Sequence, residues 1–229
     1  MNEATLWSGA PREWNNPGAK EALPQVRAAI FAGDYLKAGE LCKKMQGPYN
    51  QSYQPLGDLR LEFPVAAGAV RYERSLDLDR AVATVRYESG GATYTGEIFS
   101  SFPDQVIVMR LTCDRPKHIA FTASADSPLR HSVQTDRKDT IVVRGRAPTQ
   151  VDPSYLNSKD PIRYDDSANP EGMTFDLHIR VLAEGGSVTR GGSTISVSHA
   201  DSVMLILSAG TSFNGYDNPP DPGRRKLRL

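Results

Sequence analysis

The sequence predicts an all-β fold, an antiparallel β-sandwich with a helical hairpin inserted near its N-terminus. From Asp58 onward, short segments alternate apolar and polar residues, as at Leu59, Leu61 and Phe63, which is typical of strands with one buried face. Glycine-containing turns separate these segments, and no helical pattern lies between them. A parallel sheet needs helical crossovers, so an α/β fold is excluded. Sheets that are apolar on one face stack in pairs, which predicts a sandwich.

The helical hairpin is predicted at residues 19–46. Residues 19–31 repeat apolar side chains at three- and four-residue steps, as an amphipathic helix does. Gly33-Asp34 interrupts this pattern, residues 35–46 resume it, and Gly47-Pro48 ends it. Because the link between the two helices is so short, they must lie antiparallel or nearly so.

The strands are expected in a continuous series after the hairpin. The segment Gln105–Cys113 is almost continuously apolar, so we expect a central strand that is covered on both faces. Paired glycines supply the positive φ of tight hairpins, and they occur at Gly90-Gly91, Gly185-Gly186 and Gly191-Gly192. The other strand segments are 59–63, 76–79, 81–87, 94–100, 119–123, 133 with 140–144, 174–184, 187–190, 194–198 and 202–209.

Two segments lack strand periodicity. Residues 148–172 are rich in Pro, Asp, Asn and Tyr, and a loop of this length in a compact domain is usually functional or disordered. Residues 218–229 begin with prolines and continue into basic residues, which is typical of a linker. We therefore expect one sandwich domain over residues 1–217, followed by a linker.

The composition argues against several classes of partner. The 27 Lys and Arg residues balance the 27 Asp and Glu residues, so no net charge attracts nucleic acid or an anionic membrane. The longest apolar run, around Val203–Leu207, is far too short to span a bilayer. We expect neither a nucleic-acid nor a membrane partner. The two cysteines, Cys42 and Cys113, are far apart in sequence, and buried free thiols are favoured over a disulfide.

No catalytic or metal-binding set is expected in this segment. The acidic residues are scattered, and the densest spot, Asp165-Asp166, is better explained as a solvated loop. Glu3 is expected to cap a turn or to contact an interface. Metal-ligand spacing, a Ser nucleophile motif and a phosphate loop are all absent from the sequence, so we expect no metal and no cofactor. The histidines are expected to be ordinary surface or sheet residues: His118, His131, His178 and His199.

The opening segment and the long loop hold a set of aromatic and polar side chains. Sugar recognition combines an aromatic face with groups that hydrogen-bond hydroxyls, but Trp, Tyr and Arg also anchor protein interfaces. We favour contact with a neighbouring domain over direct sugar contact, and the two can coexist at a domain junction. The candidates are Trp7, Trp14, Arg146, Tyr155, Asn157, Arg163 and Tyr164.

Five motifs in one order connect the chain to a known family. The opening Asn2–Pro11 block is followed, after the hairpin, by Tyr53-Gln54-Pro55-Leu56-Gly57-Asp58-Leu59. Gly145-Arg146-Ala147-Pro148 with Asp152-Pro153-Ser154-Tyr155 comes next, then Gly172-Met173-Thr174-Phe175, then Ala200-Asp201-Ser202 with Thr211-Ser212-Phe213-Asn214. In this order they resemble the N-terminal β-domain of glycoside hydrolase family 95, the α-L-fucosidases. The resemblance implies that the chain is truncated at both ends relative to the full enzyme, and that a glycine-rich strand which precedes the opening block in the family is missing here.

The resemblance implies a supersandwich that supports a catalytic (α/α)6 barrel in the same polypeptide. The full enzyme would hydrolyse terminal α-1,2-linked L-fucosyl or α-L-galactosyl residues with inversion, and its substrate would be a fucosylated glycan. The family's catalytic residues lie in the barrel and none matches a position here, so this segment is expected to be inactive alone. The resemblance also suggests a bacterial, secreted or periplasmic parent. Two alternatives stay open: a free-standing carbohydrate-binding sandwich and an oligomerisation module.

Overall fold

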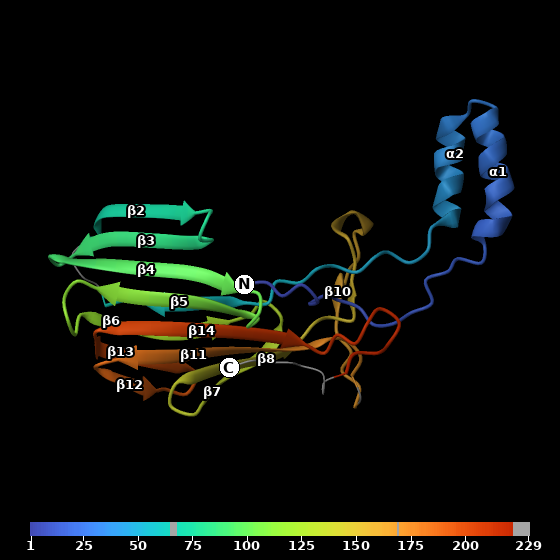
Figure 1. The fold of residues 1–229 in the computed structure, drawn as a ribbon. Coiled ribbons are helices and arrows are strands. Elements are labelled where there is room, and N and C mark those ends of the chain that lie inside the picture. Colours follow the sequence, from blue (N-terminus) through green and yellow to red (C-terminus); the bar gives the residue numbers. More distant parts are fainter. Residues whose placement is uncertain (65–67, 169, 222–229) are drawn as a thin grey trace.

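The computed structural model describes residues 1–64, 68–168 and 170–221, which form two stacked sheets and a helical arm (Figure 1). The larger sheet has eight strands in the spatial order β2 (Val70–Asp77), β3 (Val82–Ser89), β4 (Ala92–Ser101), β5 (Val106–Cys113), β14 (Ser202–Thr211), β11 (Thr174–Glu184), β8 (Thr140–Arg146) and β7 (Arg130–Asp136). The smaller sheet has four strands in the order β1 (Asp58–Glu62), β6 (Ile119–Asp126), β13 (Thr194–Ala200) and β12 (Ser187–Arg190). The strand pairs in both sheets are antiparallel, and the predicted all-β sandwich is confirmed.

The core lies between the two sheets and follows the alternation of the strands. On β11, Phe175, Leu177, Ile179 and Val181 are buried at every second position, since successive side chains point to opposite faces. They belong to one apolar cluster with residues of β6, β8, β13 and β14. Each such side chain stabilises the fold by about 1.5–3 kcal/mol relative to exposure. A register slip by one residue would turn the whole set away from the core.

The prediction that residues 105–113 are covered on both faces is wrong. β5 does lie in the middle of the larger sheet, between β4 and β14, but its side chains are half-buried along most of its length. The reason is that the four-stranded sheet is too narrow to cover the whole inner face of the eight-stranded sheet. Contacts between the sheets are made mainly by β6 and β13 with β8 and β11. β2, at the far edge, is exposed throughout.

The helices form where the periodicity predicts them, as α1 (Ala19–Phe31), α2 (Tyr35–Cys42) and a 3-10 turn η1 (Lys43–Met45). Between α1 and α2, Gly33 takes a φ of 76°. Asp34 then accepts a hydrogen bond from the Lys37 amide at 3.1 Å and caps α2. The two helices lie side by side and project from one end of the sandwich (Figure 1). We call α1, α2 and η1 the arm.

The two thiols are free, as expected, but they are not both buried. Cys113 on β5 is half-buried and Cys42 on the arm is exposed. Burial raises the pKa of the Cys113 thiol. Within the described part of the chain, no helix has the length and apolar character to cross a bilayer.

The glycine pairs differ from one another in backbone conformation. Gly90-Gly91 and Gly185-Gly186 take positive φ and form the expected tight hairpins. Gly191-Gly192 does not take positive φ, so that expectation is wrong. Here the Gly191 amide donates to the Thr194 carbonyl at 2.8 Å, and a Cβ on Gly191 would lie 2.5 Å from Thr194 Oγ1. Glycine at position 191 therefore allows the backbone to lie close to Thr194, and it does not supply a left-handed conformation.

The long loop is not structureless. It contains a small antiparallel ribbon of β9 (Gln150–Val151) and β10 (Ile162–Arg163), with a 3-10 turn η2 (Ser154–Leu156) between them. Strands of two residues carry no detectable period, which is why the sequence pattern did not predict them.

Candidate functional site

The opening segment and the long loop lie at the end of the sandwich from which the arm projects (Figure 1). Four segments meet there: residues 5–14, 50–54, 148–173 without 169, and 211–221. We call them together the arm-side end. Backbone hydrogen bonds join the segments, from the Gly9 amide to the Pro148 carbonyl at 2.8 Å and from the Ser212 amide to the Thr174 carbonyl at 2.9 Å.

A cavity of about 240 Å³ opens at the arm-side end. Its aromatic side chains are exposed at its edge, and the amides of Gln51, Asn214 and Asn218 also line it. A preformed depression with ring faces and a few polar groups suits either a sugar or an apolar protein surface. We call it the aromatic pocket, after Trp7, Trp14, Phe213 and Tyr216.

Trp7 is fixed on the pocket by contacts within the chain. Its indole Nε1 donates to the Ala4 carbonyl at 3.1 Å, and its ring meets Tyr53 edge to face, with centroids 5.4 Å apart. The polar atom of the indole is therefore already paired. What the side chain presents to a ligand is its apolar ring surface.

A polar network beneath the pocket ties the opening segment, the base of the arm and the long loop together. Gln51 accepts from Ser8 Oγ at 2.9 Å and donates to Gln150 Oε1 at 3.1 Å. The same Gln150 oxygen accepts from Arg12 Nη1 at 2.6 Å. These contacts hold the two amides and the guanidinium in place, so the floor of the site is preorganised.

Arg146 and Tyr164, two of the predicted site residues, lie together in a cluster that also contains Arg130 and Asp166. Arg146 donates to the Asp165 carbonyl at 2.6 Å and to Asp166 at 2.7 Å. Arg130 donates to Asp166 at 2.5 Å and stacks over the Tyr164 ring at 4.1 Å. Hydrogen bonds from the backbone amides of the following loop residues hold the pKa of Asp165 below its usual value. This cluster fixes the outgoing half of the long loop against β7 and β8.

The remaining predicted site residues hold the other half of the loop. Arg163 makes two hydrogen bonds to Asp152, at 2.9 and 3.1 Å. Hydrogen bonds from Gln150 and then from Arg163 lower the pKa of Asp152. Tyr155 is exposed and meets Tyr49 edge to face at 5.8 Å. Asn157 takes a left-handed φ of 49° and ends η2, as Asn tolerates.

Of the candidates, Trp7 and Trp14 line the aromatic pocket, and the loop residues do not. Phe213 and Tyr216, which do line it, were not among the candidates. Phe213 lies in one of the family-like motifs, and both follow the last strand in a segment without periodicity. That combination of exposed aromatics after a final strand was a usable signal.

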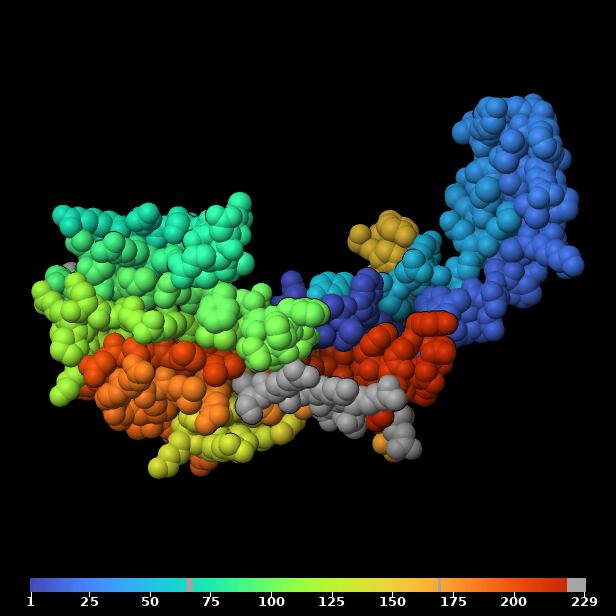
Figure 2. All heavy atoms as spheres, viewed as in Figure 1, coloured from blue at the N-terminus to red at the C-terminus, as the bar shows by residue number. Residues whose placement is uncertain are grey.

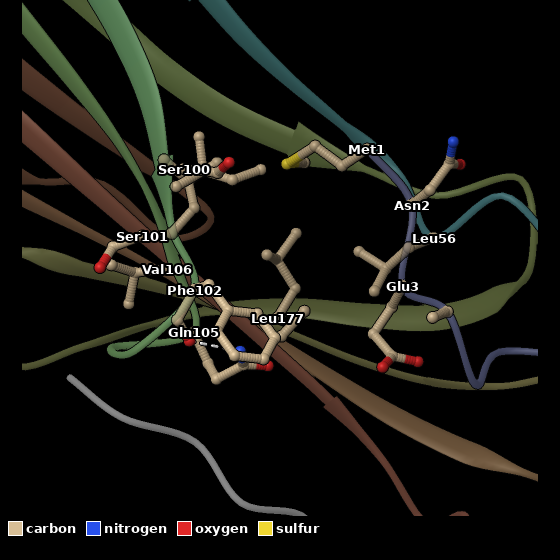
Figure 3. A pocket seen from close by; sticks show the side chains of 14 residues that line it. Met1, Asn2, Glu3, Leu56, Ser100, Ser101, Phe102, Gln105, Val106 and Leu177 are labelled. Atoms are coloured by element: carbon tan, nitrogen blue, oxygen red, sulfur yellow. Dashed lines mark hydrogen bonds between the residues drawn. The ribbon is translucent and has the colours of Figure 1, made fainter. Parts of the chain in front are cut away.

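A larger cavity of about 350 Å³ lies between the N-terminal segment and the β4–β5 hairpin. Figure 3 shows Met1, Asn2 and Glu3 on one side of it, and Ser101 and Phe102 on the other. Glu3 is its one carboxylate. Its Oε2 accepts from the Thr5 amide at 2.8 Å and from Thr5 Oγ1 at 2.6 Å. Glu3 therefore caps a turn, as expected.

Three described carboxyl groups have pKa values displaced in the direction opposite to that of a general acid. Acid catalysis at a glycosidic bond uses a carboxyl group whose pKa is raised. The described carboxyl groups with a displaced pKa are Asp114, Asp152 and Asp165, and in each the pKa is lowered. Within the same residues, no group of three or more His, Cys, Asp or Glu side chains could hold a metal ion.

Comparison with known proteins gives matches along nearly the whole chain. Residues 1–216 match the family described as "Glycosyl hydrolase family 65, N-terminal domain". The chain is 36% identical to "Alpha-L-fucosidase 2" of Arabidopsis thaliana, over 98% of this chain and 28% of that protein. It is similar to "Probable alpha-fucosidase A" of Aspergillus niger, at 34% identity over 93% of this chain and 26% of that protein. The protein of the same name from Aspergillus oryzae is 26% identical over 94% of this chain and 28% of its own length. The chain thus spans just over a quarter of each of these relatives.

Proposed function

The chain belongs to the family of glycosyl hydrolase family 65 N-terminal domains, and from this premise we propose that it is the non-catalytic N-terminal domain of an α-L-fucosidase-like glycoside hydrolase. Three relatives named as α-fucosidases, each matched over more than nine tenths of this chain, support the proposal. The finer assignment in this proposal, to a family 95 enzyme that hydrolyses terminal α-1,2-L-fucosyl or α-L-galactosyl residues with inversion, rests on the motif resemblance alone, because the matched family model carries the family 65 name.

In this proposal the sandwich packs on the catalytic (α/α)6 barrel of the same polypeptide and shapes its cleft. The observation that carries the proposal is the aromatic pocket. Its ring faces are exposed, while the indole Nε1 of Trp7 and the amide nitrogen of Gln51 are paired within the chain. Burial of such a surface in a protein interface costs little desolvation free energy. Its exposed rings are of the kind that anchors protein contacts.

The lowered pKa values of two loop carboxylates fit the proposed non-catalytic role. A carboxylate whose pKa is depressed stays ionised at neutral pH and is a poor proton donor. Asp152 and Asp165, the acids of the long loop with displaced pKa values, are of this kind. The bond cleavage is then assigned to the part of the parent that this chain does not contain.

The test is a domain exchange. The N-terminal region of the Arabidopsis relative that this chain matches is replaced by this chain, and hydrolysis of a fucosyl chromogenic substrate is measured. We expect the chimaera to be active, and the isolated chain and the relative without an N-terminal domain to be inactive. Activity of the isolated chain, or an inactive chimaera that is soluble and folded, would contradict the proposal.

A free-standing carbohydrate-binding module is the second candidate, and the ring face of Trp7 beside Gln51 and Asn214 favours it. Calorimetry of the isolated chain with fucosylated oligosaccharides separates the two. Binding that is lost in Trp7→Ala supports a carbohydrate-binding role, and absence of binding supports the barrel-supporting role alone.

A further inference from the structure

The arm is attached to the sandwich only at its base. Its small core consists of Val26, Ala29, Ala38 and Leu41, which pack on one another. Its principal contacts are between α1, α2 and η1, and none of the main element contacts joins it to a strand. Figures 1 and 2 show it standing clear of both sheets. Beyond its own core, the printed contacts of the arm with the rest of the described chain are at its base, where Asn16 donates to the Lys44 and Gln46 carbonyls at 2.8 Å.

The far end of the arm carries an apolar patch. Because Gly33 and Asp34 turn the chain tightly between the helices, the last turn of α1 and the first turn of α2 present their side chains together. We call this patch the arm tip. Its residues and exposed fractions are Ile30 44%, Phe31 87%, Tyr35 72% and Leu36 88%.

An arm of this kind is poorly stable without a partner. α1 has 13 residues and α2 has 8, whereas isolated helices shorter than about 12–15 residues are marginal in water. The arm tip adds apolar surface that water solvates unfavourably. Both problems are removed if the tip packs against another surface.

We propose that the arm tip docks on the catalytic region of the parent polypeptide. This inference rests on the proposed function and adds a second contact to it. The arm leaves the sandwich beside the aromatic pocket, since Pro11 and Trp14 line that pocket and lead into α1. A Cβ on Gly47, where the chain returns, would lie 2.6 Å from the Trp14 carbonyl oxygen. In this proposal the aromatic pocket and the arm tip contact the same catalytic region at two separate places.

The size of the patch favours a tethered partner over a second copy of the chain. Four exposed side chains of this kind offer on the order of 500 Å², whereas a stable contact between separate molecules buries about 800 Å² on each. Within one polypeptide the effective concentration reaches the millimolar range, so a smaller patch suffices. The relatives extend well beyond the matched region, since this chain covers 28% of the Arabidopsis protein.

The experiment uses the chimaera described above, with Phe31→Ser and Leu36→Ser introduced together. The matched control carries Arg27→Ser and Lys37→Ser, which are exposed positions on the same two helices. We expect amide exchange in residues 19–42 to become about tenfold or more faster in the tip variant than in the control, because two buried apolar contacts are lost. We also expect a lower melting temperature of the chimaera.

The isolated chain supplies the second measurement. There the tip has no contact with a strand among the main contacts of the described residues, so the tip variant and the control should exchange and melt alike. An equal loss in the isolated chain would mean that the tip acts within the domain, and the inference would be overturned. Identical tip and control chimaeras would also overturn it while leaving the proposed function standing. A chimaera with the native tip that is folded but inactive would contradict both this inference and the proposed function.

Discussion

Trp7 and Tyr53 pair as an isolated antiparallel β-bridge, and their ring planes meet at 64°. The arm lies between these two residues in the sequence, so the bridge closes its base. On either side of the bridge, the Ser8 amide donates to the Ser52 carbonyl and the Gln54 amide to the Leu6 carbonyl, both at 2.9 Å. Leu6 is fully buried in the sandwich core. The base of the arm is therefore anchored in the sandwich even though its helices are not.

The Trp7–Tyr53 pair should be energetically coupled. In a double-mutant cycle of Trp7→Ala and Tyr53→Ala, we expect a coupling of about 0.5–1.5 kcal/mol, the value of an aromatic pair beyond its buried area. The measurement is the free energy of urea unfolding of the four variants. A cycle of Trp7→Ala with Tyr72→Ala, on the far edge strand, should be additive. Equal coupling in both cycles would show that the ring contact contributes nothing specific.

Two glycines in similar pairs should respond very differently to alanine. Gly186 has a φ of 66°, and a Cβ there would collide with the Ser198 carbonyl. Gly186→Ala should therefore destabilise the fold by more than about 1–2 kcal/mol. Gly192 has open space around it and no positive φ, so Gly192→Ala should stay within about 0.5 kcal/mol of the parent chain. Chemical unfolding compares them, and a similar loss at both positions would refute the distinction.

His178 on β11 should make stability depend on pH. Its Nε2 is buried and has no hydrogen-bond partner among the residues that the structure describes. Burial lowers the pKa of the imidazole, with Arg144 adding to the effect and Asp176 and Asp136 opposing it. The folded state thus binds the proton less readily than the unfolded state, so stability is lost as the pH falls below the unfolded pKa of about 6.5.

Replacement of His178 tests this dependence. The unfolding midpoint in urea is measured at pH 7.5 and 5.5 for the parent chain, His178→Leu, and His118→Leu at an exposed position. We expect the decrease between the two pH values to be smaller in His178→Leu and unchanged in His118→Leu. If the unfolding midpoint of His178→Leu falls between pH 7.5 and 5.5 as much as that of the parent chain, groups other than His178 cause the loss of stability at low pH.

Arg163 should hold the ribbon of the long loop without contributing much to global stability. Arg163→Ala removes both hydrogen bonds to Asp152, and we expect amide exchange in residues 150–163 to become several-fold faster. The free energy of unfolding should change by about 1 kcal/mol, because the Arg163 side chain is about half exposed while the Asp152 side chain is largely covered. Lys159→Ala, in the same loop, is the control. Unaltered exchange in Arg163→Ala would show that the ribbon is held by its backbone alone.

The helices and most strands were predictable because their signals are local. Helical spacing ends where Gly33-Asp34 intervenes, and the alternation in residues 174–184 marks a strand with the same bounds in the structure. β9 and β10 escaped prediction because a two-residue strand has no period. Gly191 was misinterpreted because a double glycine marks either positive φ or close approach, and only the neighbouring Thr194 distinguishes the two.

Of the site, the sequence predicted the aromatic residues better than their roles. Trp7 and Trp14 do line the aromatic pocket. Arg146 and Arg163 were equally plausible contacts for a ligand, yet the structure pairs them with Asp166 and Asp152 of the same loop. Whether a guanidinium is free or already bound depends on which carboxylate folds beside it. Residue type does not carry that information.

By itself the sequence determined the all-β class, the relation to a glycoside hydrolase N-terminal domain and the positions of the arm and most strands, since periodicity and motif order are read along the chain. Only the tertiary structure decided that β5 is half-exposed, that Phe213 and Tyr216 join Trp7 in one pocket, and that the arm stands away from both sheets. These features depend on which strands cover which faces. Coverage is set by long-range pairing between segments, such as β11 with β14, that no local pattern specifies.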